Sequence, residues 1–160
     1  MDQSVKLKLS VVGVGNAGCQ AVQLAHKYGH SVFAINSSEK DLNDNIVDKN
    51  IHAVLIGNKR GAGKNRTTAK EFLKVELKEI FNNKDFLEIV EPADVVVVVG
   101  STAGGTGSGI GPLLSNRIQA TYPSKICIFF GVLPKHSESA QAQFNALECV
   151  NEASHDSLKM

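Results

Sequence analysis

The chain has 160 residues, with 17 Lys and Arg against 16 Asp and Glu and a formal net charge of +1. This length is typical of one domain, and the balanced charge excludes a protein that binds nucleic acid through bulk positive charge. Hydrophobic residues make up 42% and charged residues 21%, as in an ordinary folded protein. We therefore interpret residues 1–160 as one domain with no direct contact to nucleic acid.

Membrane insertion and secretion are not predicted. No apolar stretch approaches the roughly 18–20 residues of a membrane-spanning helix, and residues 1–4 lack the apolar core of a signal peptide. Cys19, Cys127 and Cys149 are widely spaced and form no CxxC pair, so neither a disulfide framework nor a zinc site is expected. These features predict a protein of the reducing cytoplasm.

Apolar runs alternate with segments of helical periodicity along the whole chain. The predicted strands are residues 6–13, 31–36, 51–57, 95–99 and 125–132. The predicted helices are residues 17–28, 67–81, a segment through Leu113, Leu114 and Ile118, and a last one from Glu138 onward. Residues 37–43 are polar and predict a turn or one helical turn, and residues 151–160 offer no further strand.

The clearest strand is a run of five valines, Val95–Val99. A strand without alternation is buried on both faces, which is typical of the middle of a parallel sheet. Together with the repeated strand–helix alternation, it predicts an α/β fold: a Rossmann-like, doubly wound, mainly parallel sheet with helices on both faces. Such sheets bind ligands at the carboxyl ends of their strands, where five polar loops are predicted to converge. These loops are residues 13–18, 36–41, 57–66, 100–109 and 134–138.

The first loop, residues 13–18, fits the dinucleotide pattern GxGxxG between a strand and a helix. The second strand, however, ends in Asn36, where a dinucleotide fold needs an acidic residue for the ribose. This motif alone leaves dinucleotide and mononucleotide binding open. A Walker loop at residues 58–65 is rejected because Asn58 and Asn65 replace its glycine and its Ser or Thr. Lys59 and Arg60 are expected to be solvated, whereas Gly61, Gly63, Lys64 and Arg66 are available to a phosphate.

Residues 100–109 have five glycines and four hydroxyl residues between a buried strand and a helix. Packing alone does not require so many glycines, each of which adds a cost in conformational entropy. Successive backbone N–H groups in such a loop can form a nest for an anion, and hydroxyl groups can bind phosphate oxygens. This loop predicts a phosphate site.

The segment Ala103–Gly109, AGGTGSG, resembles the tubulin/FtsZ signature GGGTG[ST]G, with alanine in place of the first glycine. The run GNAGCQ at residues 15–20 is similar to the first nucleotide loop of the same family, and INSS at residues 35–38 resembles its INTD segment. GAGKNR at residues 61–66 and VLPK at residues 132–135 are most similar to the plasmid- and phage-encoded TubZ branch. The resemblance spans essentially the whole chain.

The resemblance implies a site for GTP or GDP with Mg²⁺. Gly15, Asn16, Gly18 and Gln20 would line the phosphate and sugar side, and Asn36 and Ser38 would lie near the metal and the terminal phosphate. Gly63 and Arg66 would approach the γ-phosphate, Glu138 the ribose and Asn145 the guanine. Ser38 stands where FtsZ has an aspartate, so no metal ligand is assigned. The residues that would wrap the α- and β-phosphates are Ala103, Gly104, Gly105, Thr106, Gly107 and Ser108.

In this family the residues that activate hydrolysis come from a later region, inserted into the neighbouring subunit's site. The resemblance therefore implies a nucleotide-binding domain without catalytic residues of its own, which binds nucleotide without efficient turnover. It further implies longitudinal self-association into filaments, an exposed apolar surface on one face of the sheet, a DNA-bound adaptor protein as partner, and a role in plasmid or phage DNA segregation. A non-catalytic assembly or filament-capping protein is the main alternative. An NAD-dependent enzyme is a weaker one, because of Asn36 and the loop at residues 104–109.

Overall fold

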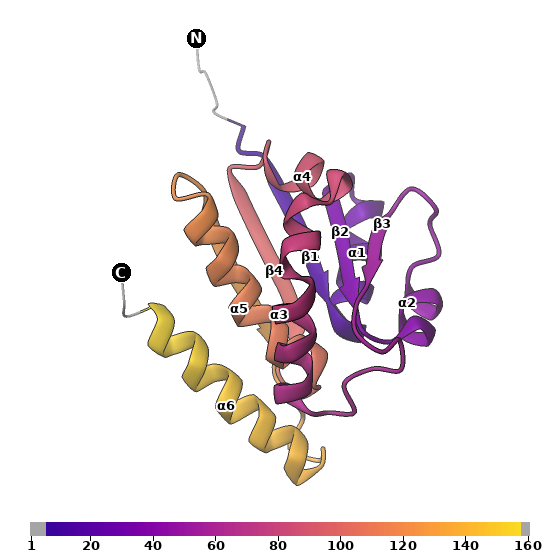
Figure 1. Cartoon of the computed structure of the whole chain (residues 1–160), viewed down its shortest axis with the longest axis vertical. Coiled ribbons are helices and arrows are strands. Elements are labelled where there is room, and N and C mark those ends of the chain that lie inside the picture. Colours follow the sequence, from indigo (N-terminus) through magenta and orange to yellow (C-terminus); the bar gives the residue numbers. More distant parts are fainter. Residues whose placement is uncertain (1–5, 158–160) are drawn as a thin grey trace.

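The structure is a computed structural model that describes residues 6–157, with side chains as far as Ser154. Five strands form one sheet in the order β3-β2-β1-β4-β5, and all four strand pairings are parallel (Figure 1). The predicted doubly wound α/β fold is therefore confirmed. The strands are β1 (Leu9–Val14), β2 (Ser31–Asn36), β3 (His52–Leu55), β4 (Val95–Ser101) and β5 (Ile126–Val132). The helices are α1 (Gly15–Lys27), α2 (Glu39–Asn45), α3 (Arg66–Asn82), α4 (Lys84–Val90), α5 (Thr106–Thr121) and α6 (Ala140–Ser157).

Alternate side chains of the strands pack against helices on opposite faces of the sheet. On one face, Val12, Val98 and their neighbours contact α3, α4 and α5, which lie in front of the sheet in Figure 1. On the other face, Val11 and Val99 contact Cys19 and Val22 of α1. The valine run pairs with β1, and Val96, Val98 and Val99 are buried as its sequence predicts, whereas Val95 and Val97 are partly exposed. Helix α6 packs outside α5 through Ala142, Ala146 and Cys149.

The edge strand β5 is covered on one face only. Its side chains alternate, and those on the α1 face stay between 43% and 60% exposed. The four residues are Ile126, Ile128, Phe130 and Val132. An exposed apolar strip on one face of the sheet, which the resemblance implies, is therefore present in the described part of the chain.

Several elements differ from the sequence expectations, most clearly α1, α4 and α6. Helix α1 begins at Gly15, inside the glycine motif, because the strand ends only one residue earlier. Helix α4 is not expected from the sequence; it is short, and the Asn83 side chain caps it by accepting from the N–H of Phe86 at 3.0 Å. Helix α6 continues to Ser157, into the polar stretch at residues 151–160, of which residues 158–160 lie outside the described part. Within residues 6–157, no helix is long and apolar enough to cross a membrane.

Candidate nucleotide site

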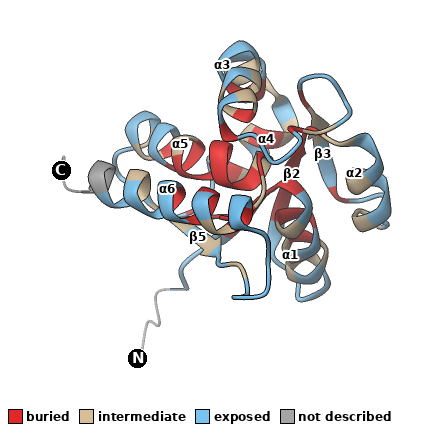
Figure 2. Cartoon of the chain, turned by 90° about the horizontal axis from the view of Figure 1, so that it is seen from below, coloured by how far each residue is buried: buried red, intermediate tan, exposed pale blue. Residues whose placement is uncertain are grey.

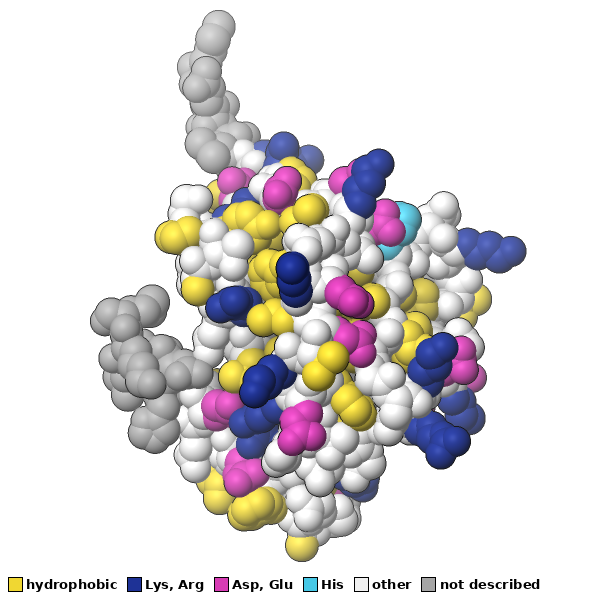
Figure 3. Space-filling view, viewed as in Figure 1, with side chains coloured by type: hydrophobic (Ala, Val, Ile, Leu, Met, Phe, Trp, Pro, Cys, Tyr) yellow, Lys and Arg dark blue, Asp and Glu magenta, His cyan; other side chains and the backbone are white. Residues whose placement is uncertain are grey.

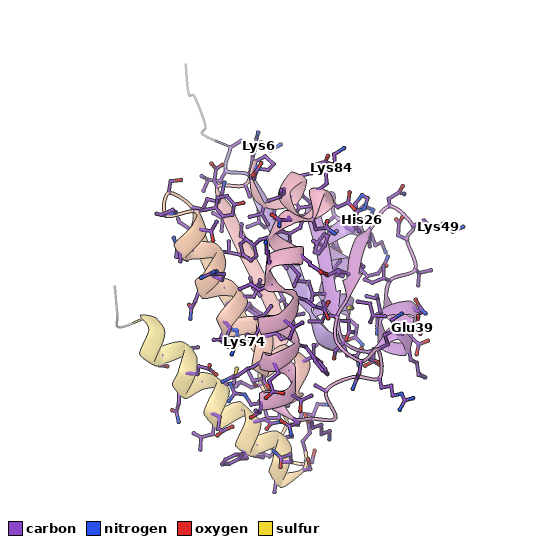
Figure 4. All side chains as sticks on the ribbon, in the orientation of Figure 1. Lys6, His26, Glu39, Lys49, Lys74 and Lys84 are labelled. Atoms are coloured by element: carbon purple, nitrogen blue, oxygen red, sulfur yellow. The ribbon has the colours of Figure 1, made fainter. Side chains whose placement is uncertain are left out.

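Two loops flank the point where the strand order reverses. From β1 the chain continues sideways to β2, while β4 lies on the other side of β1. The loops that follow β1 and β4 therefore diverge to opposite faces and leave a crevice between them, which is where open parallel sheets bind ligands. Lys6 and Lys84, labelled in Figure 4, lie at the opposite end of the sheet, where the strands begin. Figure 2 views the molecule from the end where the loops converge.

The helices α1 and α5 begin directly at this crevice, and neither has a side-chain cap. The other four helices of the described chain are capped. Ser38, Asn65, Asn83 and Ser139 accept from the backbone N–H groups of Asp41, Thr68, Phe86 and Ala142. The first N–H groups of a helix have no partner within the helix, so an uncapped terminus offers donors and a partial positive charge to an anion.

The loop after β2 is held by its own side chains. Asn36 is buried, and its Oδ1 accepts from the backbone N–H groups of Ser37 and Ser38 at 2.8 and 3.1 Å. The Ser37 hydroxyl lies 2.7 Å from that of Thr106, the first residue of α5. This contact fixes the end of β2 to the glycine loop after β4.

The loop between β3 and α3, residues 57–65, is tied to the loop after β2. Gly61 donates to the carbonyl of Ser37 at 2.8 Å, and Glu39 donates to the carbonyl of Lys59 at 2.9 Å. Glu39, on the first turn of α2, is labelled in Figure 4. The two loops therefore form one connected wall of the crevice.

The crevice holds a cleft of about 390 Å³. Its lining contains two basic residues, Arg60 and Lys64, and two acidic residues, Asp41 and Glu138. Eleven of the residues that the resemblance places at the site line it together: Gly15, Asn16, Asn36, Ser38, Gly63, Ala103, Gly104, Gly105, Thr106, Gly107 and Glu138.

Five predicted residues do not line the cleft: Gly18, Gln20, Arg66, Ser108 and Asn145. Gly18 packs against Gly13 and Val99. Gln20 is exposed on α1. The buried hydroxyl of Ser108 donates to the carbonyl of Gly104 one turn earlier, which shapes the loop from behind.

Arg66 and Asn145, for which the resemblance implies phosphate and base contacts, are held by protein partners. The Arg66 guanidinium is 8% exposed and pairs with Glu148 and Glu152 of α6. The Asn145 amide, 2% exposed, donates to the carbonyls of Lys64 and Ala103 at 2.9 and 3.0 Å. Neither side chain lines the cleft: Arg66 connects α3 to α5 and α6, and Asn145 holds two loop carbonyls.

Arg60 and Asp41 are charged lining residues that the sequence did not assign to the site, whereas Lys64 was expected to be available to a phosphate and does line the cleft. From the sequence, Arg60 was expected to be solvated in a basic glycine-rich loop. A signal for Arg60 could have come from the antiparallel bridge with Ser38, but this contact depends on how the two loops meet in space.

No group of three or more His, Cys, Asp or Glu side chains gathers within the described residues as a metal site would require. Asp41 is the acidic residue of the cleft that lies beside the loop after β2.

Cys19, next to this loop on α1, is fully buried. Burial raises the pKa of its thiol from 9.0 to about 11, although the Asn36 amide, 3.5 Å from Sγ, favours the thiolate slightly. Since the folded state binds this proton more tightly than the unfolded state, the stabilising contribution is complete below about pH 9 and is lost between pH 9 and 11.

We expect the unfolding free energy of the native chain to decrease by about 1–3 kcal/mol more than that of Cys19→Ala between pH 8 and 11. Denaturant titrations of both proteins at the two pH values measure this difference. Parallel pH dependences in the two proteins would contradict the raised pKa.

Comparison with known proteins assigns the chain to a family. The family model "Tubulin/FtsZ family, GTPase domain" matches residues 8–158. The chain is 32% identical over 147 residues to the tubulin-like protein TubZ of Clostridium botulinum C phage, covering 92% of this chain and 40% of that protein.

Two solved structures share this fold. The GDP-bound monomer of CetZ1 from Haloferax volcanii superposes with a TM-score of 0.83 at 27% identity, covering 94% of this chain and 48% of that one. A protofilament of TubZ from bacteriophage PhiKZ superposes with a TM-score of 0.73 at 25% identity, covering 92% and 43%. The chain thus spans less than half the length of these relatives. Because the family model covers almost the whole sequence, the chain belongs to the tubulin/FtsZ family and carries its GTPase domain.

Proposed function

We propose that the cleft binds GTP or GDP, with the phosphates between the N-termini of α1 and α5. The observation that carries this proposal is the capping pattern: four helices are capped by side chains, and the two uncapped helices open onto one cleft. A diphosphate or triphosphate would supply the acceptors that these N–H groups lack. The related CetZ1 monomer has GDP bound, which supports the choice of a guanine nucleotide.

The residues that line the cleft are proposed to contact different parts of the nucleotide. Gly15 and Asn16, at the start of α1, and residues 103–107, before and within the first turn of α5, would surround the phosphates. Glu138 also lines the cleft and would hold the ribose hydroxyls, although its Oε1 also accepts from the N–H of Lys135 at 2.9 Å. Asn36 and Gly63 would flank the terminal phosphate.

Mg²⁺ would accompany the nucleotide, because the charge of the phosphates exceeds that of the two basic lining residues. Asp41 fits this role chemically: carboxylate oxygens are ligands that Mg²⁺ prefers, and Asp41 lines the cleft on the first turn of α2. Bound to phosphate oxygens, the ion would neutralise part of their charge.

The TubZ of bacteriophage PhiKZ, which is longer than this chain, forms a protofilament. We infer that the present domain contributes the nucleotide-holding half of a cytoplasmic, filament-forming GTPase that acts in plasmid or phage DNA segregation with a DNA-bound adaptor. By itself it would bind nucleotide without efficient turnover. A non-catalytic assembly or capping protein is the second candidate, favoured by the exposed apolar strip on β5.

Calorimetric titration of the chain with GTP, GDP and ATP, with and without Mg²⁺, tests the proposal. Binding of guanine nucleotides in preference to ATP supports it. The absence of binding by all three nucleotides would contradict it, and GTP turnover abolished by chelation of Mg²⁺ would contradict the expected lack of turnover.

Gly104→Ala should weaken nucleotide binding without unfolding the protein. Gly104 lines the cleft, and an added Cβ would meet no protein atom within 4 Å, so the methyl group would occupy space in the phosphate nest. We expect at least a tenfold loss of GTP and GDP affinity, because hydrogen bonds to charged groups contribute about 1.5–3 kcal/mol each. Titration gives the affinity and thermal unfolding gives the stability.

Gly29→Ala is the control for this substitution. Gly29 also has open space around it, but it lies outside the cleft and its φ is 83°, so alanine there strains the backbone without approaching the phosphates. Equal nucleotide affinities for the two variants would contradict the placement of Gly104 in the nest.

A further inference from the structure

The side-chain amide of Asn16 lies at the cleft, on the first turn of α1. An amide group has two different ends: its oxygen only accepts hydrogen bonds, and its nitrogen donates two. A bound nucleotide would bring negatively charged oxygen atoms into the cleft, and these oxygens need donors. The end of the Asn16 amide that faces the cleft therefore decides whether this side chain favours or opposes binding.

The orientation of this amide is set by Asn45, the last residue of α2, which does not itself line the cleft. Asn45 Nδ2 donates to Asn16 Oδ1 at 2.7 Å. It also donates to the backbone carbonyl of Asp41, one turn earlier in α2, at 2.7 Å. Both hydrogens of the Asn45 amide nitrogen are thus in use.

The carbonyl of Asp41 fixes which way both amides point. A backbone carbonyl oxygen can only accept, so the atom of Asn45 that lies against it is the nitrogen. The same nitrogen lies against Asn16, so the atom of Asn16 in this contact is the oxygen. The amide nitrogen of Asn16 is left with no hydrogen-bond partner among the residues that the structure describes, and its two hydrogens are available to a ligand.

This contact connects two helices that border the cleft from different loops, α1 after β1 and α2 after β2. Asn45 is uncharged, so its effect on a ligand comes through the direction of the Asn16 amide and not through net charge. Its bond to Asp41 also holds the end of α2, and the Asp41 side chain lines the cleft. An experiment must therefore separate the action of Asn45 through Asn16 from its action through α2.

We propose that Asn45 is a positioning residue, which holds the Asn16 amide with its N–H donors toward the cleft so that they bind an oxygen atom of the nucleotide. The proposal rests on the proposed nucleotide function. It adds to the site a residue outside the cleft that belongs to none of the glycine loops.

The test is a double-mutant cycle of Asn16→Ala, Asn45→Ala and the variant with both substitutions. Calorimetry with Mg²⁺ gives the GTP and GDP affinities, and thermal unfolding gives the stability. We expect Asn16→Ala and Asn45→Ala each to weaken both nucleotides by roughly threefold to tenfold. The double variant should bind within about twofold of Asn16→Ala, because Asn45 has nothing to orient once the Asn16 amide is absent.

Asn43→Ala is the matched control, since Asn43 is exposed on the same helix and does not line the cleft. Its affinities should stay within about twofold of those of the native chain. If Asn45 acted only by holding the end of α2, Asn45→Ala would weaken binding by the same factor whether or not Asn16 is present. Such additive losses would overturn the positioning role.

Nuclear magnetic resonance of the isotope-labelled native chain gives a second readout, which does not depend on a variant that folds. The side-chain amide signals of Asn16, identified by their loss in Asn16→Ala, should shift when GDP is added, because the free N–H groups enter hydrogen bonds. If the native chain binds no guanine nucleotide, the proposed function fails and the role of Asn45 with it. If it binds GDP and the Asn16 amide signals do not move, the positioning role is overturned while the nucleotide site stands.

Discussion

Gly18→Ala is expected to destabilise the fold by about 3 kcal/mol or more. A Cβ at this position would lie 2.6 Å from the carbonyl oxygen of Val99 and 2.7 Å from the carbonyl carbon of Gly13. Both obstacles are backbone atoms of central strands, β4 and β1, and they cannot move aside as a flexible side chain could. Relief requires α1 to shift away from the sheet, which would separate Cys19 and Val22 from their core neighbours.

Chemical denaturation of Gly18→Ala and Gly104→Ala side by side measures this effect. The two glycines come from the two phosphate loops predicted by sequence, but only Gly18 is enclosed by backbone. We expect a large decrease in the unfolding free energy for Gly18→Ala and a change within about 0.5 kcal/mol for Gly104→Ala. A Gly18→Ala protein of native stability that has lost only nucleotide affinity would show that Gly18 acts in the site and not in packing.

The convergence of the loops could be predicted from sequence because it follows from topology. Carboxyl ends of parallel strands share one edge of a sheet, so the glycine loops at residues 13–18 and 100–109 had to meet there once the strands were placed. The role of each glycine could not be predicted. The sequence does not distinguish a glycine enclosed by backbone from a glycine that lines an open cleft, and only the surrounding atoms separate Gly18 from Gly104.

Long polar side chains were harder to place, since they reach several ångströms from their own backbone. Arg66 follows the loop at residues 57–65 and was expected to reach the phosphates, yet its side chain turns to α6, which is 82 residues away in sequence at Glu148. Asn145 is on the expected helix, but its amide holds two loop carbonyls. Helix α4 was not predicted because a helix of seven residues is too short to show a recognisable periodicity of apolar residues. Its start is marked only by the capping residue Asn83.

Arg66→Ala is expected to destabilise the protein by about 3 kcal/mol and to leave no selective loss of triphosphate affinity. Arg66 is the first residue of α3, and its buried guanidinium connects this helix to two others. It pairs with Glu148 at 3.2 Å and with Glu152 on α6, and it donates to the carbonyl of Ser108 on α5 at 3.1 Å. Acidic and basic side chains gather over α3 and α6 in Figure 3. Truncation would leave Glu152, which is 21% exposed, with Lys70 at 2.8 Å as its remaining partner.

The control is Lys84→Ala. Lys84 pairs with Glu88 at 3.7 Å and both side chains are exposed, so this ion pair should contribute less than about 0.5 kcal/mol to the unfolding free energy. Denaturation with nucleotide titration on the same samples separates the two possible roles of Arg66. If Arg66 has a structural role, we expect a large stability loss with GTP and GDP affinity weakened alike, because loosening α3 and α6 would disturb the loops that are proposed to contact both nucleotides. If Arg66 contacts a phosphate, we expect native stability with a loss of affinity confined to GTP.

Arg66→Lys is expected to recover only part of the stability that Arg66→Ala loses. A lysine cannot reproduce the guanidinium's simultaneous contacts with two carboxylates and a carbonyl, so a partial recovery would not be explained by a simple requirement for positive charge.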